Sequence, residues 1–528
     1  MTAARAAADR AAPARVTVGG PPLTLADLAA VAAGSAVSLA PESASRVAAS
    51  RALVDEVLRR GEAVYGVNTG FGALKSVRVP DDEVERLQLN LLRSHAAGYG
   101  PELEPAAVRL MLALRAHSLA LGMSGVRPAL IEHLLAMLAE GVLPVVPSRG
   151  SLGASGDLIP LAHLALAAVG EGEARRGGRV AAAAEHLSAA GLSPITLQAK
   201  EGLALINGTQ AAAALGALAL LESFEILGAA HAACALSIEA LRGSAKPFDV
   251  RVHAARPHPG QTASAAAVRR LLEGSGILAS HSGCARVQDP YSLRCAPQVL
   301  GASIQAARYA RAVLLTEVNS VTDNPLCFAD SGEVLSAGNF HGQPLAQALD
   351  FLAIGMAEVG AVAERRTFLL LDSSKSDLPP FLSREAGLTS GLMIVQYLQA
   401  SLVSENKMLA QPASVDSIPT SAGQEDHVSM AMHAAVKALT LTRNVRRIVA
   451  AELLCAAQGI EFLRPLRSSA PLEALHAGVR SRVPPLVADR RQDQDLASLD
   501  DWIAESGAAR AAGIESFADG PVAEGGGR

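Results

Sequence analysis

Three small residues, Ala154, Ser155 and Gly156, lie where the backbone itself could do chemistry. They follow Gly153 and precede Asp157, and glycine tolerates the close backbone contacts of a very tight turn. In such a turn the amide nitrogen of Gly156 can reach the carbonyl carbon of Ala154. If it attacks and two waters are lost, Ser155 becomes a dehydroalanine within a five-membered imidazolone ring. The product would be an electrophile made from the chain alone.

The same residues also fit an ordinary turn, in which Gly and Ser are common. A serine-hydrolase elbow is excluded, because that motif needs Gly-x-Ser-x-Gly and Asp157 occupies its last position. Other side chains that could bind or react lie in polar or glycine-rich segments far apart in the sequence. They are Tyr65, His95, Asn207, Gln288, Tyr291, Arg294, Phe340 and Glu425.

The segment 148–173 resembles the cofactor-forming segment of the aromatic amino-acid ammonia-lyases, and the resemblance extends over about residues 23–465. In that family Ala-Ser-Gly cyclises autocatalytically to 4-methylidene-imidazol-5-one (MIO). The resemblance therefore implies an MIO built from Ala154, Ser155 and Gly156 and a carbon–nitrogen lyase activity. Pyridoxal phosphate is not expected, because none of the six lysines lies in a recognisable pyridoxal motif. No metal site is predicted.

The resemblance also implies roles for residues outside this segment. Tyr65 matches the catalytic tyrosine that takes the β-proton of the substrate, which requires a pKa well below the usual value of about 10. Arg294 matches the arginine that holds the substrate carboxylate, a task suited to a guanidinium fork. Tyr291 matches a second active-site tyrosine, and Gln288 a supporting amide. A structural tyrosine and a surface ion pair are the alternatives for Tyr65 and Arg294.

Two further residues match positions around the MIO ring. Asn207 is expected to hydrogen-bond near the ring and the substrate, and Phe340 to lie against the ring. Asn207 equally fits a helix cap, where asparagine is among the preferred residues. Phe340 equally fits a core position.

Two residues favour histidine as the substrate. His95, in the pair Ser94-His95, matches histidine-type members, although the pair also occurs in some tyrosine enzymes. Glu425 stands where members that act on phenylalanine or tyrosine generally carry glutamine. A carboxylate can accept a hydrogen bond from an imidazole N–H, but it gains nothing from a phenyl ring. Glu425 also fits a carboxylate at a helix start. Gly423, where asparagine is usual, and Ala296 depart from the family pattern.

The expected reaction is the non-oxidative deamination of L-histidine to trans-urocanate and ammonia, the first step of histidine degradation. The resemblance implies a homotetramer whose active sites combine residues from three subunits. One alternative is a tyrosine or phenylalanine ammonia-lyase or aminomutase with the same MIO. A catalytically inactive helical scaffold is another.

Composition limits the remaining classes. Half of the 528 residues are hydrophobic and only 3% are aromatic, so the core must consist mainly of Ala, Leu and Val, and the first two favour helices. The net charge of −5 and the lack of a basic tract argue against nucleic-acid binding. An odd number of cysteines without a Cys-x-x-Cys pair indicates reduced thiols in a cytoplasmic protein. They are Cys234, Cys284, Cys295, Cys327 and Cys455.

Hydrophobic periodicity predicts a mainly α fold, in which a large helical bundle accompanies a smaller N-terminal α+β region that bears the MIO. The expected divisions are a disordered extension (1–15), the MIO-bearing domain (16–209), the long-helix bundle (210–518) and a flexible tail (519–528). Polar residues interrupt the apolar stretch 203–241, which is therefore read as a buried helix and not as a membrane span. Helices are predicted at 47–60, 81–97, 105–121, 128–140, 210–241, 303–319, 344–371, 391–410 and 428–458, and extended segments at 17–23, 142–147 and 178–181.

Overall fold

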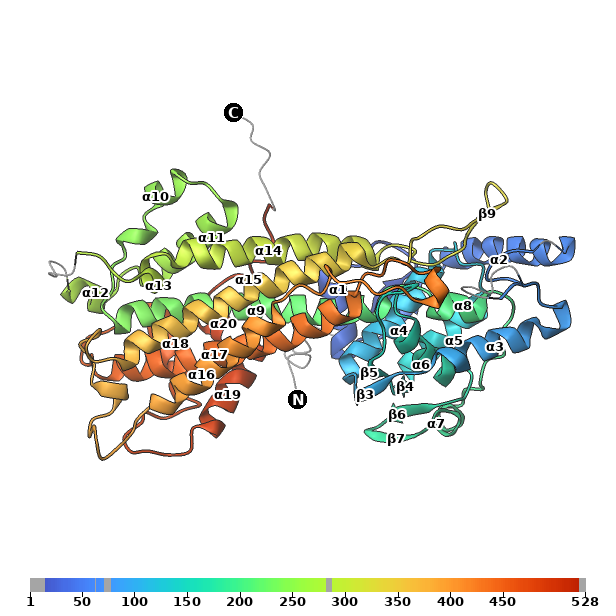
Figure 1. Cartoon of the computed structure of the whole chain (residues 1–528). Coiled ribbons are helices and arrows are strands. Elements are labelled where there is room, and N and C mark those ends of the chain that lie inside the picture. The colour runs from blue at the N-terminus through green and yellow to red at the C-terminus, as the bar shows by residue number, and fades with distance from the viewer. Residues whose placement is uncertain (1–14, 62, 71–76, 282–286, 522–528) are drawn as a thin grey trace.

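The structure, a computed structural model, describes residues 15–61, 63–70, 77–281 and 287–521. Most of the predicted extension (1–15), the end of the predicted tail (519–528) and Cys284 lie outside these residues. The chain forms an elongated bundle of long helices with a smaller region of short helices and strands at one end (Figure 1). The mainly α class predicted from the sequence is confirmed. The predicted boundary at 209–210 stays a prediction.

The smaller region combines helices with short strands. A parallel pair joins β1 to β2, antiparallel pairing joins β3 to β5, and β4, β6 and β7 form a three-stranded sheet. Alanine- and leucine-rich α4 is buried along almost its whole length, with a proline in its first turn. The elements are β1 (Val16–Val18), α1 (Leu25–Ala33), β2 (Val37–Leu39), α2 (Ser43–Arg60), α3 (Val84–His95), β3 (Tyr99–Glu102), α4 (Pro105–Ala120), α5 (Pro128–Ala139), β4 (Leu143–Pro144), β5 (Pro147–Arg149), α6 (Leu158–Ala168), β6 (Glu173–Arg176), β7 (Arg179–Ala182), α7 (Ala183–Ala189) and α8 (Glu201–Ile206).

Three long helices, α9, α15 and α17, pack on one another and form the centre of the bundle, with α14 against α9 and α15. Their small and branched side chains are buried together in one continuous core. The elements are α9 (Gln210–Ala240), α10 (Val250–Ala254), α11 (Pro259–Leu272), α12 (Gly276–Ser280), α13 (Tyr291–Arg294), α14 (Ala296–Val318), β8 (Leu326–Phe328), β9 (Glu333–Leu335), α15 (Gln343–Leu371), α16 (Met393–Leu409), α17 (Ala431–Glu461), α18 (Ala470–Arg480), α19 (Asp493–Ala504) and α20 (Gly507–Ala511).

The apolar stretch 203–241 contains parts of two helices, and the longer one matches the helix predicted at 210–241. Helix α8 ends at Ile206 and α9 begins at Gln210, so a three-residue break separates them. In α9 and α15 the most apolar windows have the length and composition of a membrane span, but 83% and 61% of their residues are buried inside the protein. This burial is what a core helix of a bundle shows.

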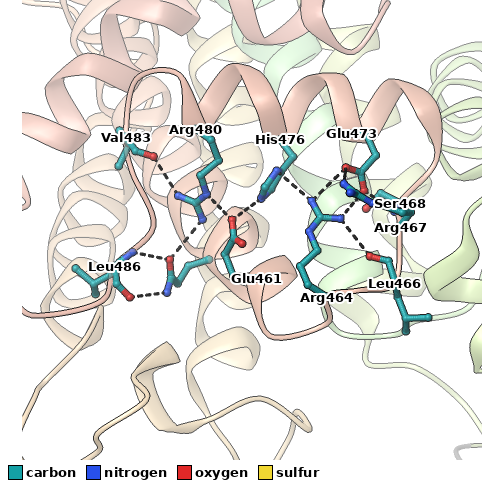
Figure 2. A network of polar contacts seen from close by, with 11 residues as sticks. Glu461, Arg464, Leu466, Arg467, Ser468, Glu473, His476, Arg480, Val483 and Leu486 are labelled. Atoms are coloured by element: carbon teal, nitrogen blue, oxygen red, sulfur yellow. Dashed lines mark hydrogen bonds and ion pairs between the residues drawn. The ribbon is translucent and has the colours of Figure 1, made fainter.

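Helix α18, the next helix after α17, is tied to the end of α17 by a polar network (Figure 2). Glu461 accepts from Arg480 Nε at 2.8 Å and contacts His476 Nε2 at 2.9 Å. Arg464 donates to Glu473 at 2.6 Å on the same side of the helix. These contacts fix the bundle end farthest from the small strands (Figure 1).

Candidate active site

The Ala154-Ser155-Gly156 segment forms a tight turn between β5 and α6. Ser155 and Gly156 have φ angles of 50° and 77°, and Gly153 pairs with Gly156 across the turn. A left-handed φ is uncommon for a residue other than glycine, so Ser155 is held in a strained conformation. The strain is maintained by Gly208, whose N–H donates to Ser155 O at 3.3 Å and whose carbonyl accepts from Asp157 N at 2.7 Å.

Glycine is required at position 156 for two reasons. Its φ lies in the left-handed region, and a Cβ there would lie 2.2 Å from Gly208 O. No side chain fits such a contact, so the backbone of Gly208 can approach this turn only because the residue is glycine. The approach of Gly156 N to the carbonyl carbon of Ala154, expected from the sequence, stays a prediction.

Asp157 anchors the turn to the bundle. Its buried carboxylate accepts from Ala212 N at 2.7 Å and from Ser151 Oγ at 3.1 Å. Burial raises the pKa of Asp157 to about 6, although these hydrogen bonds lower it in part. Sequence reasoning gave this residue no role, although an acidic residue directly before an apolar helix was a usable signal.

A cavity of about 200 Å³ opens beside the turn. Ala154 and Gly156 line it together with His95 from the end of α3 and Glu425 from the loop before α17. Most of the remaining lining is apolar or backbone, including Leu152, Leu158 and Ile159. The cavity has room for a small ligand. The fold thus brings together four residues that the sequence places up to 330 positions apart.

Two of the polar side chains that line this cavity, those of His95 and Glu425, are hydrogen-bond acceptors. His95 Nδ1 lies 2.8 Å from Leu91 O, and because a carbonyl can only accept, we assign the proton to Nδ1 and leave Nε2 as an acceptor. Glu425 is half-buried, and its Oε2 accepts from Thr420 Oγ1 at 2.7 Å. Glu425 lies six residues before α17 begins, so it is not a helix-start carboxylate. Thr420, which also lines the cavity, was not predicted as a site residue.

Asn207 occupies the break between α8 and α9, directly before the glycine that holds the turn. Its side chain donates to Asp323 Oδ1 at 3.0 Å and to Asn324 O at 2.9 Å, so it does not cap α9. Its carbonyl oxygen Oδ1 is buried and has no hydrogen-bond partner among the described residues. An orphaned buried acceptor next to the turn fits a site that receives a further donor.

The loops of Tyr65 and Phe340 also border this region. Gly66 packs against Leu203 of α8, and half-buried Tyr65 contacts the main core. Phe340 is half-buried, and two residues later Gly342 lies against Ser429, the residue that also packs on Gly153.

Gln288, Tyr291 and Arg294 lie at the opposite end of the bundle from the turn (Figure 1). Asp289 accepts from Ser244 N, just after the C-terminal end of α9, whereas Asp157 binds the first turn of the same helix. At about 1.5 Å per residue, the 31 residues of α9 separate the two groups by about 45 Å. Tyr291 is 70% exposed, and the Arg294 guanidinium stacks on its ring at 4.4 Å. A single chain therefore does not bring these residues to the cavity.

Lys200 was another residue that sequence reasoning left without a role. Its ammonium group is fully buried and lies 2.7 Å from Asp323 Oδ2, which is also fully buried. No signal in the sequence links these positions, which are 123 residues apart.

Within the described ranges no group of three or more His, Cys, Asp or Glu is placed to hold a metal ion.

A long-helix bundle with a strained Ala-Ser-Gly turn beside a small cavity fits a carbon–nitrogen lyase. The comparisons place the chain within this class. The family model described as aromatic amino acid lyase matches residues 23–481, and the chain belongs to that family.

Relatives and solved structures agree with this assignment. A histidine ammonia-lyase from Aromatoleum aromaticum is 54% identical over 489 residues, which cover 92% of this chain and 93% of the relative. The crystal structure of histidine ammonia-lyase from Trypanosoma cruzi is 43% identical, with a TM-score of 0.88 over 94% of this chain and 95% of that one. The crystal structure of tyrosine aminomutase from Streptomyces globisporus is 37% identical, with a TM-score of 0.89 over 94% of this chain and 98% of that one.

Proposed function

We propose that this chain acts as a histidine ammonia-lyase that converts L-histidine to trans-urocanate and ammonia. The observation that carries the proposal is the cavity beside the Ala-Ser-Gly turn, whose lining includes two side chains that can accept hydrogen bonds, Glu425 and His95. An imidazolium ring offers two N–H donors at its rim, and a phenyl ring offers none. The high identity to relatives named histidine ammonia-lyase supports the same substrate.

The residues of the turn fit the formation of MIO. Ser155 and Gly156 both have left-handed φ angles, and such a tightly folded turn is what a ring closure between Gly156 N and Ala154 C requires. When formed, the MIO supplies the electrophile that makes the amino group of the substrate a leaving group. The protein residues then bind the substrate, orient it and move its β-proton.

The proposed roles are those that the family resemblance implies for these residues. Glu425 and His95 orient the imidazole ring. Asn207 binds the substrate beside the cofactor turn, and Phe340 packs near that turn. Tyr65 takes the β-proton. Arg294 holds the carboxylate, with Tyr291 and Gln288 beside it.

We infer that the functional form is a cytoplasmic homotetramer with active sites shared among three subunits. The tetramer is what the family resemblance implies, and geometry supports the shared sites, because about 45 Å of α9 separates Arg294 from the turn within one chain. Another copy must therefore supply Gln288, Tyr291 and Arg294. Sedimentation at decreasing protein concentration tests this inference. Activity per chain should fall together with the tetramer fraction, and a fully active monomer would refute a shared site.

The function itself is tested by an ultraviolet assay of the purified protein with L-histidine, L-tyrosine and L-phenylalanine, alongside its intact mass. We expect urocanate from L-histidine and a mass two waters below that of the sequence. Coumarate or cinnamate as the main product would keep the MIO chemistry and reassign the enzyme to the tyrosine or phenylalanine group. An unchanged mass without any product would indicate an inactive helical scaffold.

A further inference from the structure

The buried ion pair Lys200–Asp323 lies directly behind the active-site residue Asn207. Lys200 Nζ is 2.7 Å from Asp323 Oδ2, and both side chains are fully buried. The other carboxylate oxygen, Oδ1, accepts from Asn207 Nδ2 at 3.0 Å and from Asn324 N at 2.7 Å. Lysine, aspartate and asparagine thus form one chain of hydrogen bonds that ends at the residue next to the cofactor turn.

This chain fixes which way the Asn207 amide points. One end of the amide faces two acceptors, Asp323 Oδ1 and Asn324 O, so that end must be the NH₂ group. The carbonyl Oδ1 is then forced to the other side, where it is buried and lacks a donor among the residues that the structure describes. An unpaired buried acceptor is costly, so a role in binding accounts for its persistence.

The backbone around Lys200 shows that the arrangement is built under constraint. Lys200 has a φ of 74°, a left-handed conformation that is unfavourable for a lysine. It immediately precedes α8, the helix that ends at Asn207. Its side chain also lies under Gly66, where an added Cβ would be 3.7 Å from Lys200 Cδ. One buried lysine therefore supports both the Asn207 end of α8 and the loop that carries Tyr65.

We propose that Lys200 and Asp323 are positioning residues that hold Asn207 with its Oδ1 toward the active site, where it accepts a hydrogen bond from the ammonium group of the amino-acid substrate. The inference rests on the proposed ammonia-lyase function. Lys200 engages one carboxylate oxygen and leaves the other for Asn207. The Lys200–Asp323 ion pair therefore orients the neutral amide of Asn207.

The substitution Asp323→Asn should reverse this orientation. Lys200 would take the single remaining oxygen, so the new NH₂ group would face Asn207 Nδ2, and two donors cannot pair. Asn207 would then turn its Oδ1 inward and present its NH₂ group to the substrate ammonium. In the double variant K200M/D323N no cation competes, so the new amide oxygen is free to face Asn207 again. We therefore expect Asp323→Asn to be harmful and the second substitution to rescue it.

The experiment measures two quantities in the full-length protein: kcat and KM with L-histidine, and L-histidine binding by calorimetry in a Ser155→Ala background that cannot form MIO. D323N should weaken binding and kcat/KM by about 10-fold or more, because a lost hydrogen bond to a charged group has an effect of that size. K200M/D323N should return to within about 3-fold of the parent, within the usual variation of such contributions. In an N207A background, D323N should have no further effect.

A control variant separates positioning from stability. Asp500→Asn breaks a largely buried ion pair with Arg446 at the contact of α17 with α19, so it should lower the melting temperature and leave L-histidine binding unchanged. A loss of equal size from D323N with and without Asn207 would overturn the proposal, as would a folded K200M/D323N protein that shows no recovery. If D323N alone fails to fold, the double variant decides: binding more than about 10-fold weaker than the parent would refute the orientation.

Failure of the proposed function has a different signature. If the parent protein binds and converts L-tyrosine or L-phenylalanine in place of L-histidine, the substrate assignment is wrong. The same coupling between Asp323 and Asn207 is then measured with that amino acid, because its ammonium group is the same. If the coupling is absent with whichever amino acid binds, the positioning role is refuted.

Discussion

Replacing Glu425 by glutamine keeps the size of the side chain and removes its charge, so it isolates the interaction expected to select histidine. Glu425 lines the cavity beside Ala154 and is held by Thr420 Oγ1 at 2.7 Å. A hydrogen bond between a carboxylate and an imidazole N–H contributes about 1.5–3 kcal/mol, and a neutral one about 0.5–1.5 kcal/mol. The loss of about 1.4 kcal/mol corresponds to a decrease of about 10-fold in kcat/KM for L-histidine.

The assay compares kcat/KM for L-histidine, L-tyrosine and L-phenylalanine in the parent, E425Q and a matched control, Glu132→Gln on the exposed side of α5. E425Q should lose activity toward L-histidine and keep or gain activity toward the other two amino acids, whose rings offer the carboxylate no imidazole N–H. Glu132→Gln should leave all three values unchanged. An equal loss on every substrate in E425Q would refute the selection of an imidazole ring by this carboxylate.

Three further outcomes are expected. Gly156→Ala places a Cβ 2.2 Å from Gly208 O, so the turn should not cyclise. Peptide mass spectrometry should find no loss of two waters, and a mature ring would contradict the steric reasoning. Burial lowers the pKa of His231 to about 4, so this histidine contributes stability that is present above pH 6.5 and is lost as the pH falls toward 4. The melting temperature should therefore fall more from pH 7 to pH 5 in the parent than in a His231→Asn variant, and an equal change in both would exclude a buried neutral imidazole. Glu452→Gln leaves the fully buried charge of Arg366 unpaired and should cost about 3–5 kcal/mol, checked by denaturant unfolding; a loss below 1 kcal/mol would contradict the ion pair.

Much of the helical fold was predictable because the bundle repeats one simple pattern. Helices α9 and α15 lie within one residue of their predicted ends, since alanine and leucine dominate both segments. Helix α14 starts seven residues earlier than predicted, because Pro297 is tolerated in the first turn of a helix. Strands β8 and β9 were missed, since they are three residues each and too short to show alternation.

The candidate site was predictable only as a set of separate residues. The resemblance indicated His95, Glu425 and the Ala-Ser-Gly turn, and the structure places them around one cavity. The support behind them was not predictable, because Lys200 and Asp323 meet only through the tertiary fold. Local sequence rules contain no information on such a pairing. The length of α9 likewise decides that Arg294 lies far from the turn of its own chain, although both carry family motifs.

The division of the site between chains is tested most directly by mixing two inactive variants. Ser155→Ala removes the residue that forms the cofactor, and Arg294→Ala removes the carboxylate-binding guanidinium at the other end of the bundle. Co-expressed chains of both kinds should regain L-histidine turnover, because some sites then combine an intact turn from one chain with Arg294 from another. Chains that carry both substitutions, expressed alone, should stay inactive, because no site then has an intact turn or an Arg294 guanidinium. Absence of recovery in mixed tetramers confirmed by native mass would contradict a shared site and require Arg294 and the turn to act within one chain.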